Sequence, residues 1–319
     1  MKKVRLGRTG ARVSRFCFGT MTFGAEADEA ESGRIYAACR DAGIDFFDCA
    51  DVYAGGRSEE ILGRLIRGHR DEVFITSKCF MGRHKGASRR AIRLSCEASL
   101  KRLGVERIDL FFMHRFDAEV PLVETLRALE DLRAEGKIAH VGVSNYAAWQ
   151  IATALGIAAR EGFAPIEVIQ PMYNLIKRQA EVEILPLALA EDLGVMTYGP
   201  GAGGLLTGKY AGDFAKEPGR FSVNAEYQKR YDEPWFHEVA AAFSAFAAKR
   251  GAHPMTLAIA WAAAHPAISC PIIGARNVGQ LKASLAADAF EMTPELRAEI
   301  SILSRTPPPA TDRLEEQRA

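Results

Sequence analysis

The amino-acid sequence predicts a closed barrel of eight parallel strands, each followed by a helix. Short apolar runs and amphipathic helical stretches alternate along the chain, and counting them gives eight βα repeats. No shift in composition separates one repeat from the next, which favours one sheet closed on itself over two separate sheets. We therefore expect a single α/β domain over residues 1–319, with the (β/α)8 or TIM-barrel fold.

The pattern of apolar residues predicts an N-terminal hairpin and the strands of the barrel. Residues 3–16 alternate apolar and polar side chains around Gly7-Arg8-Thr9-Gly10, which indicates a β-hairpin that closes the bottom of the barrel. The strands of the barrel itself are expected as short apolar runs that end near polar or small residues. These runs are residues 16–18, 44–48, 73–78, 108–113, 138–143, 167–169, 195–197 and 269–273.

Helices are predicted where apolar residues recur at helical spacing, several of them ending at a glycine. The stretches are 29–42, 58–66, 88–103, 121–135, 147–160, 181–193, 235–250, 255–265, 277–287 and 294–304, the last of which extends the chain beyond the eight repeats. Residues of about 200–234 interrupt this alternation and are expected to form a long, irregular active-site loop. The C-terminal tail, residues 305–319, is expected to be flexible or lid-like.

Composition argues against several classes of partner. The net charge is +1 with both signs interspersed, which favours neither nucleic acid nor a membrane surface as a partner. The N-terminus has no apolar signal-peptide core, and the apolar stretches 240–248 and 257–264 are too short to cross a bilayer. The six cysteines include no C-x-x-C pair and the seven histidines no H-E-x-x-H pair, so no metal site is expected. We expect a reduced, cytoplasmic enzyme that is a monomer or a homo-oligomer.

Ionisable side chains follow three successive predicted strands. Asp48 and Tyr53 follow the second strand, Lys78 ends the third, and His114 follows the fourth. Each residue alone has a structural explanation, such as a loop cap or a solvated strand end. A parallel barrel, however, brings the C-terminal ends of its strands to one rim. The sequence therefore predicts that these four side chains converge on one catalytic site.

The chemistry of these four residues suits proton delivery. A tyrosine has an ordinary pKa of about 10, and a nearby ammonium lowers it by favouring the phenolate. We expect Lys78, fixed by Asp48, to act on Tyr53 in this way, and His114 to donate a hydrogen bond to a substrate carbonyl oxygen. Such a set can protonate an alkoxide as it forms, which hydride delivery to an aldehyde or ketone requires.

Together with further motifs, these residues resemble the aldo-keto reductase superfamily over nearly the whole chain. The motifs are Gly19-Thr20-Met21-Thr22-Phe23-Gly24, Phe47-Asp48 through Tyr53, Gly56-Arg57-Ser58-Glu59, Thr76-Ser77-Lys78, His114, Gly142-Val143-Ser144-Asn145, Gln170 with Tyr173-Asn174, and Leu206-Thr207-Gly208-Lys209-Tyr210. The resemblance implies a barrel without a separate dinucleotide-binding domain. It also implies an NADPH cofactor extended across the C-terminal rim, and Tyr53 as the general acid.

The resemblance also assigns cofactor contacts. Ser144, Asn145 and Gln170 match residues that hold the carboxamide, and Tyr198 matches the aromatic that stacks on the nicotinamide ring. Arg276 is placed to meet a 2′-phosphate just before a helix, so NADPH is favoured while NADH remains possible. The other expected contacts are Gly19, Thr20, Met21, Asp48, Gly199, Pro200, Gly201, Leu205, Lys209, Ile273, Gly274 and Gln280.

The substrate walls are expected to be mainly apolar, which suits a small aldehyde or ketone. They comprise Phe23, Tyr53, Phe80, His114 and Phe116. Two other functions stay open. A cofactor-sensing regulatory subunit with negligible turnover is the main alternative, because channel-associated β-subunits resemble the same superfamily. A metal-dependent lyase or hydrolase is a weaker one, since the histidine spacing does not support a metal site.

Overall fold

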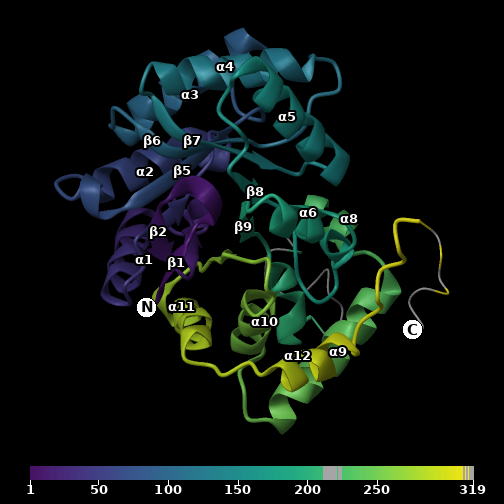
Figure 1. Ribbon diagram of the computed structural model, residues 1–319. Helices are drawn as coiled ribbons and strands as arrows, with labels where there is room; N and C mark the ends of the chain where they lie inside the picture. Colours follow the sequence, from purple (N-terminus) through teal and green to yellow (C-terminus); the bar gives the residue numbers. More distant parts are fainter. Residues whose placement is uncertain (211–220, 222–224, 312, 314, 316–319) are drawn as a thin grey trace.

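A closed barrel of parallel strands forms the centre of the computed structural model, which describes residues 1–210, 221, 225–311, 313 and 315. The eight strands pair in the order β10-β3-β4-β5-β6-β7-β8-β9, and helices surround them (Figure 1). The predicted TIM barrel is therefore confirmed. The strands are β3 (Cys17–Gly19), β4 (Phe46–Asp48), β5 (Phe74–Cys79), β6 (Ile108–Met113), β7 (Ile138–Ser144), β8 (Val168–Gln170), β9 (Gly194–Thr197) and β10 (Cys270–Ile273).

Local sequence sets where the helices begin and end. The side chains of Asp28 and Ser88 accept backbone N–H groups at the starts of α1 and α3, and Gly104 ends α3 in the left-handed region at φ 65°. The α-helices are α1 (Glu29–Asp41), α2 (Arg57–Leu65), α3 (Arg89–Leu103), α4 (Leu122–Ala134), α5 (Ala148–Glu161), α6 (Ile184–Ala190), α8 (Ala225–Arg230), α9 (Pro234–Lys249), α10 (Pro254–Ala263), α11 (Val278–Leu285) and α12 (Pro294–Ser301). Short 3-10 helices are η1 (Gly7–Thr9), η2 (Thr20–Thr22), η3 (Tyr53–Gly56), η4 (Arg70–Glu72), η5 (Gln179–Glu181), η6 (Ala202–Thr207) and η7 (Ala286–Asp288).

Two predicted segments differ from the structure. The helix expected over 181–193 is shorter, because Pro186 has no N–H and fits only within the first turn of α6. The segment 200–234, expected to be irregular, contains η6 and α8. Residues 211–220 and 222–224 of that segment lie outside the described residues, as does part of the expected C-terminal tail.

The N-terminal hairpin closes the barrel at the end opposite the C-terminal ends of its strands. Strands β1 (Lys3–Arg5) and β2 (Arg12–Ser14) pair antiparallel, as predicted. Leu6 and Val13 are fully buried among side chains from the barrel interior. Gly7 has a φ of 53°, and a Cβ at this position would lie 2.0 Å from the backbone nitrogen of Gly194. Only glycine therefore lets the hairpin approach the start of β9 so closely.

Candidate active site

Asp48 and Lys78 form a buried ion pair at the C-terminal ends of β4 and β5. Lys78 Nζ lies 2.6 Å from Asp48 Oδ2, and the side chains are 0% and 2% exposed respectively. Asp48 Oδ1 also accepts hydrogen bonds from Thr76 Oγ1 at 2.7 Å and Gln170 Nε2 at 2.9 Å. Burial, the largest single influence, favours the neutral amine, but Asp48 together with Tyr53 and Cys49 outweighs it and raises the pKa of Lys78. The ammonium is therefore charged at neutral pH.

Tyr53 accepts a further hydrogen bond from the Lys78 ammonium. Lys78 Nζ donates to the Cys49 carbonyl oxygen at 2.8 Å and to Tyr53 Oη at 3.3 Å. Burial raises the pKa of Tyr53 to about 12, and Lys78 offsets this only in part. The ammonium acts in the expected direction, but loss of solvation by water outweighs its positive charge, so the pKa of Tyr53 rises overall. The phenol keeps its proton at neutral pH.

His114 lies beside Tyr53 at the end of β6. The two rings meet edge to face, with centroids 6.3 Å apart and an interplanar angle of 81°. Burial lowers the pKa of His114 to about 3, with a further contribution from Lys78, so the imidazole is neutral. Its Nδ1 atom is buried and has no hydrogen-bond partner among the described residues. A neutral imidazole has one N–H, which it can donate to an incoming oxygen.

The residues expected to hold a carboxamide lie next to this group. Asn145 Nδ2 donates to the His114 carbonyl oxygen at 3.0 Å, and Asn145 Oδ1 accepts the Tyr198 hydroxyl at 2.6 Å. Ser144 Oγ donates to the Gln170 carbonyl oxygen at 2.9 Å. Asn145 Nδ2 also donates to Ser144 Oγ at 3.1 Å, and Gln170 donates to Asp48, so hydrogen bonds connect Ser144, Asn145, Gln170 and Tyr198 to the buried ion pair. Asn145 has a φ of 57°, the left-handed region that asparagine tolerates.

Three glycines after Tyr198 take left-handed conformations and are partly exposed. Gly199 has a φ of 70° and free space where a side chain would stand, and Gly203 and Gly204 are also left-handed. Successive N–H groups in such conformations bind anions well. Lys209 lies close by, with its Cε 3.2 Å from the position of a Gly204 Cβ. The N–H groups of Ala202 and Gly204 already donate to the carbonyl oxygens of Gly199 and Gly201 at 2.9 Å, so the space at Gly199 and the Lys209 ammonium are what this stretch offers a pyrophosphate.

The far end of the expected cofactor site lies between β10 and α11. Arg276 is partly exposed and its guanidinium forms no ion pair within the described part of the chain. Its backbone N–H donates to Gln280 Oε1 at 3.1 Å, so Gln280 orders this turn. The side chain of Asn277 accepts the Gln280 N–H at 2.9 Å and caps α11. An uncompensated guanidinium beside a helix start fits a phosphate.

Some residues predicted to contact the cofactor or the substrate are buried or already form hydrogen bonds within the protein. Phe23 is fully buried, with its ring centroid 5.6 Å from that of Phe18, and its assignment as a substrate wall stays a prediction. The hydroxyl of Thr20 donates to the Asp48 carbonyl oxygen at 3.1 Å and is already satisfied. Leu205 and Ile273 are buried, which leaves their backbone for any cofactor contact. Gly19, Met21, Pro200, Gly201 and Gly274 stand near the ends of β3, β9 and β10.

Phe80 and Phe116, the other expected wall residues, lie in the turns after β5 and β6 and are partly buried. Phe116 packs edge to face on Tyr146 at 5.3 Å and on Trp149 at 5.9 Å between ring centroids. Trp149 is 64% exposed at the start of α5. These three rings form what we term the rim aromatic group, Phe116, Tyr146 and Trp149.

The sequence interpretation missed three residues around the site. Thr76 could have been found, because it precedes Lys78 by two positions and strand periodicity places both on the same face. Trp149 could have been suspected from its position in the first turn of α5. Asp51 gave no local signal, since its isolation from hydrogen-bond donors depends on the folded structure.

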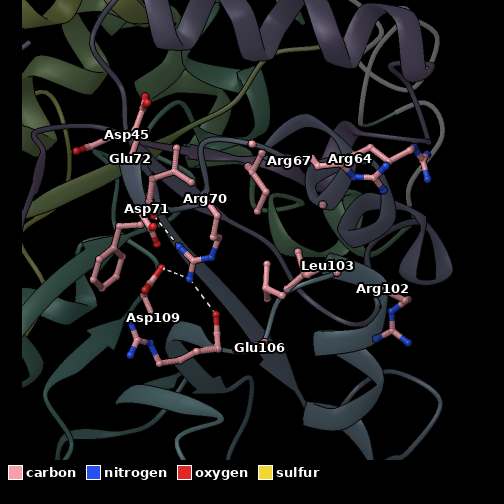
Figure 2. Close-up of a pocket in the computed structure, with 18 of the residues that line it drawn as sticks. Asp45, Arg64, Arg67, Arg70, Asp71, Glu72, Arg102, Leu103, Glu106 and Asp109 are labelled. Carbon is pink, nitrogen blue, oxygen red and sulfur yellow. Dashed lines mark hydrogen bonds and ion pairs between the residues drawn. The ribbon is translucent and has the colours of Figure 1, made fainter.

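A hollow of about 1050 Å³ lies at the opposite end of the barrel (Figure 2). It is lined around the first residues of β5 and β6 by side chains of both signs, including Asp45, Glu106 and Arg107. Arg70 and Asp109 there pair with each other at 2.8 Å. This hollow is distinct from the candidate active site. It lies at the other end of the strands from Lys78, and its side chains carry both charges.

All six cysteines lie in the described part of the chain, and each is buried with a free thiol. Within the described residues, no three His, Cys, Asp or Glu side chains gather as metal ligands. Every helix described there is too short or too polar to cross a lipid bilayer.

Comparison with known proteins gives two kinds of relative. The model of the Aldo/keto reductase family matches residues 15–305. A probable voltage-gated potassium channel subunit beta of Oryza sativa is 36% identical, over 98% of this chain and 99% of its own. An uncharacterized oxidoreductase of Bacillus subtilis is 34% identical, over 93% of this chain and 94% of its own. Aflatoxin B1 aldehyde reductase member 2 of Rattus norvegicus is 35% identical, over 84% of this chain and 78% of its own.

Proposed function

The chain belongs to the aldo/keto reductase family of NAD(P)H-dependent oxidoreductases, and on that premise we propose that it uses NADPH to reduce a small aldehyde or ketone, with Tyr53 as proton donor. The observation that supports this most directly is the series of contacts from Asp48 through Lys78 to Tyr53, at 2.6 and 3.3 Å. The same contacts place a protonated phenol next to a permanent positive charge.

The proposed proton transfer follows from these charges. A bound nicotinamide cofactor supplies the hydride. Tyr53 passes its proton to the carbonyl oxygen as negative charge develops there, and the Lys78 ammonium stabilises the phenolate that remains. His114 is neutral and donates its N–H to the same oxygen, which orients the substrate. Asp48 keeps the ammonium in place throughout.

The proposed cofactor contacts use the residues near the rim. Ser144, Asn145 and Gln170 hold the carboxamide, and Tyr198 provides the surface on which the nicotinamide ring stacks. The backbone near Gly199 meets the pyrophosphate. The Arg276 guanidinium, which forms no ion pair with the described residues, would meet the 2′-phosphate, which is why NADPH is proposed over NADH.

The reductase proposal is tested with a panel of aldehydes and ketones, by following NADPH oxidation with 4-nitrobenzaldehyde among the substrates. Tyr53→Phe removes the acidic proton and keeps the ring, so kcat should fall by about 10²–10⁴-fold. The Kd for NADPH, measured by fluorescence quenching, should change by less than about twofold because the hydroxyl acts only on the substrate. A Phe variant that still turns over at the wild-type rate would show that Tyr53 is not the proton donor.

A second candidate function is a cofactor-sensing regulatory subunit. It is favoured by the close match in length to a relative named as a potassium channel subunit beta. Such a subunit would bind NADPH tightly and turn over every carbonyl in the panel negligibly. Tight binding combined with turnover that Tyr53→Phe abolishes supports the reductase instead.

A further inference from the structure

Asp51 is a buried carboxylate next to the candidate proton donor. It lies in the turn between Asp48 and Tyr53, and its backbone N–H donates to the Lys78 carbonyl oxygen at 3.1 Å. The side chain is 6% exposed, and both carboxylate oxygens are buried without a hydrogen-bond partner among the described residues. Since almost all buried polar groups in proteins have partners, this isolation requires an explanation.

The turn after β5 packs directly on this carboxylate. A Cβ at Gly82 would lie 2.5 Å from both Cγ and Oδ2 of Asp51. Only glycine fits there, so the backbone of the turn covers the carboxylate. The same turn contains Phe80, whose φ of 125° is unusual for a residue with a side chain. Asp51 therefore joins the turn that carries Tyr53 to the turn that carries an expected substrate wall.

The surroundings of Asp51 favour its neutral form. The titratable and charged groups that face it are Glu59 on α2, Arg102 on α3, and Lys78 and Cys79 on β5. Arg102 Nε bonds to Glu59 Oε2 at 2.6 Å, so the guanidinium is held on Glu59 and lowers the pKa of Asp51 only in part. Burial, followed by repulsion from Glu59, outweighs Arg102, the Gly82 backbone N–H and Lys78, and raises the pKa of Asp51 to about 7. The Cys79 thiol stays neutral, because burial raises its pKa as well.

No member of the candidate catalytic group changes charge near neutral pH. Burial raises the pKa of Tyr53 to about 12 and lowers that of His114 to about 3. Asp48 holds the pKa of Lys78 above its ordinary value. Asp51 is thus the buried group beside the site whose charge changes between about pH 6 and pH 8.

We propose that protonated Asp51 is a positioning residue that holds the Tyr53 turn against the Phe80–Gly82 turn, and that its ionisation loosens both turns and slows carbonyl reduction. A neutral carboxyl can stay under Gly82 at modest cost, whereas a carboxylate that completes no hydrogen bond with the described residues must gain water or move. Either response displaces the backbone that Asp51 shares with Lys78 and Tyr53. The proposal rests on the reductase function proposed above, because Tyr53 delivers the proton there.

The first test compares pH profiles. Asp51→Asn keeps the shape of the side chain and cannot ionise. With a non-ionising aldehyde and saturating NADPH, kcat/KM of the wild type should fall at least about fivefold from about pH 6 to about pH 8.5, roughly 1 kcal/mol. The Asn variant should vary less than about twofold. Asp109→Asn, a carboxylate variant at the other end of the barrel, should keep the wild-type profile.

A second test needs no turnover. Hydrogen–deuterium exchange of residues 80–86, corrected for the intrinsic effect of pH, should accelerate at about pH 8.5 in the wild type and not in Asp51→Asn. Two single variants check the contact itself. Gly82→Ala should raise this exchange, because its Cβ would lie 2.5 Å from the Asp51 carboxylate, and Asp51→Ala should also raise it, because the side chain that holds the turn is then absent.

The outcomes are separable. A wild-type pH profile and exchange rate that do not change from about pH 6 to about pH 8.5 would overturn the role of Asp51. So would an Asn variant that retains the wild-type dependence. If no carbonyl is reduced at any pH, the reductase function fails, and the exchange measurement alone decides whether Asp51 holds the two turns together. Poor folding of Asp51→Asn leaves the wild-type profile and the Gly82→Ala exchange as the deciding results.

Discussion

Asp48 and Asp51 are the same side chain three residues apart, and their surroundings give them opposite properties. Asp48 receives three hydrogen bonds, from Lys78, Thr76 and Gln170. Asp51 receives none from the described residues. Removing one partner of a buried ion pair costs about 3–5 kcal/mol, so Asp48 and Lys78 hold each other charged. A carboxylate without such partners is stable chiefly in its protonated form.

Asp51→Asn is expected to stabilise the folded protein increasingly as pH rises. The unfolded chain loses the Asp51 proton near its ordinary pKa of about 4, whereas the folded protein keeps it to about 7. The contribution of Asp51 to wild-type stability therefore falls with pH across this window by up to about 4 kcal/mol and is level above it. The amide variant lacks this loss.

The measurement is urea unfolding of both proteins at about pH 4 and about pH 8, compared as a difference in free energy. Asp41→Asn, at an exposed position at the end of α1, serves as control and should show no pH-dependent gain. A constant difference between Asp51→Asn and wild type at both pH values would mean that Asp51 is not protonated in the folded protein.

At the scale of elements, the start of α11 combines three features. Asn277 caps the helix, Gln280 bonds the Arg276 backbone, and Glu31 Oε1 accepts the N–H of Val278 at 3.1 Å. These bonds fix the backbone of the turn while the Arg276 guanidinium stays uncompensated among the described residues. The backbone at the start of α11 is therefore held by hydrogen bonds, and the Arg276 side chain beside it carries the charge that would bind a phosphate.

Arg276→Ala should weaken NADPH binding at least about tenfold, because a charge-assisted contact to a phosphate contributes about 1.5–3 kcal/mol. NADH lacks the 2′-phosphate, so its Kd should change less than about twofold. Both Kd values are measured by fluorescence quenching. Arg133→Ala, which removes a positive charge that Glu130 already neutralises on α4, is the matched control. Equal losses for both coenzymes in Arg276→Ala would contradict contact with the 2′-phosphate.

The rim aromatic group is expected to contribute to substrate binding through Trp149. Trp149→Ala should raise KM for aromatic aldehydes about two- to tenfold, since an aromatic contact contributes about 0.5–1.5 kcal/mol. KM for a short aliphatic aldehyde should stay within about twofold. Leu189→Ala, an exposed apolar residue on α6, is the control. The same rise in KM for both aldehydes would assign Trp149 to the fold and not to the substrate.

Most of what could be predicted from the sequence came from the periodicity of its apolar residues and from the polar residues that follow its strands. The barrel and the convergence of Asp48, Tyr53, Lys78 and His114 follow from local patterns and from one rule of parallel barrels. The pKa of Tyr53 could not be predicted in direction, because it depends on how much water the fold removes. The burial of Phe23 also depends on tertiary packing.

At the scale of the whole molecule, the two ends of the barrel differ in what fills them. The C-terminal ends of the strands present ionisable side chains and open backbone. The other end is closed by Leu6 and Val13 from the hairpin, which join the interior apolar side chains. The charged hollow in Figure 2 lies toward this closed end, where Arg12 of β2 also lines it. The apolar residues that stabilise the barrel thus lie at one end and the candidate catalytic residues at the other, as is usual for this fold.

This separation predicts that a cavity at the closed end weakens the fold without changing the chemistry. Leu6→Ala should lower the free energy of unfolding by about 2–5 kcal/mol, because Leu6 is fully buried inside the barrel. Leu189→Ala, at a side chain that is 56% exposed, should change it by less than about 0.5 kcal/mol. Urea unfolding measures both, and kcat/KM of the folded Leu6→Ala protein should stay within about twofold of wild type. A selective loss of turnover in Leu6→Ala with unchanged stability would show that the hairpin acts on the catalytic rim, because a cavity alone cannot produce that result.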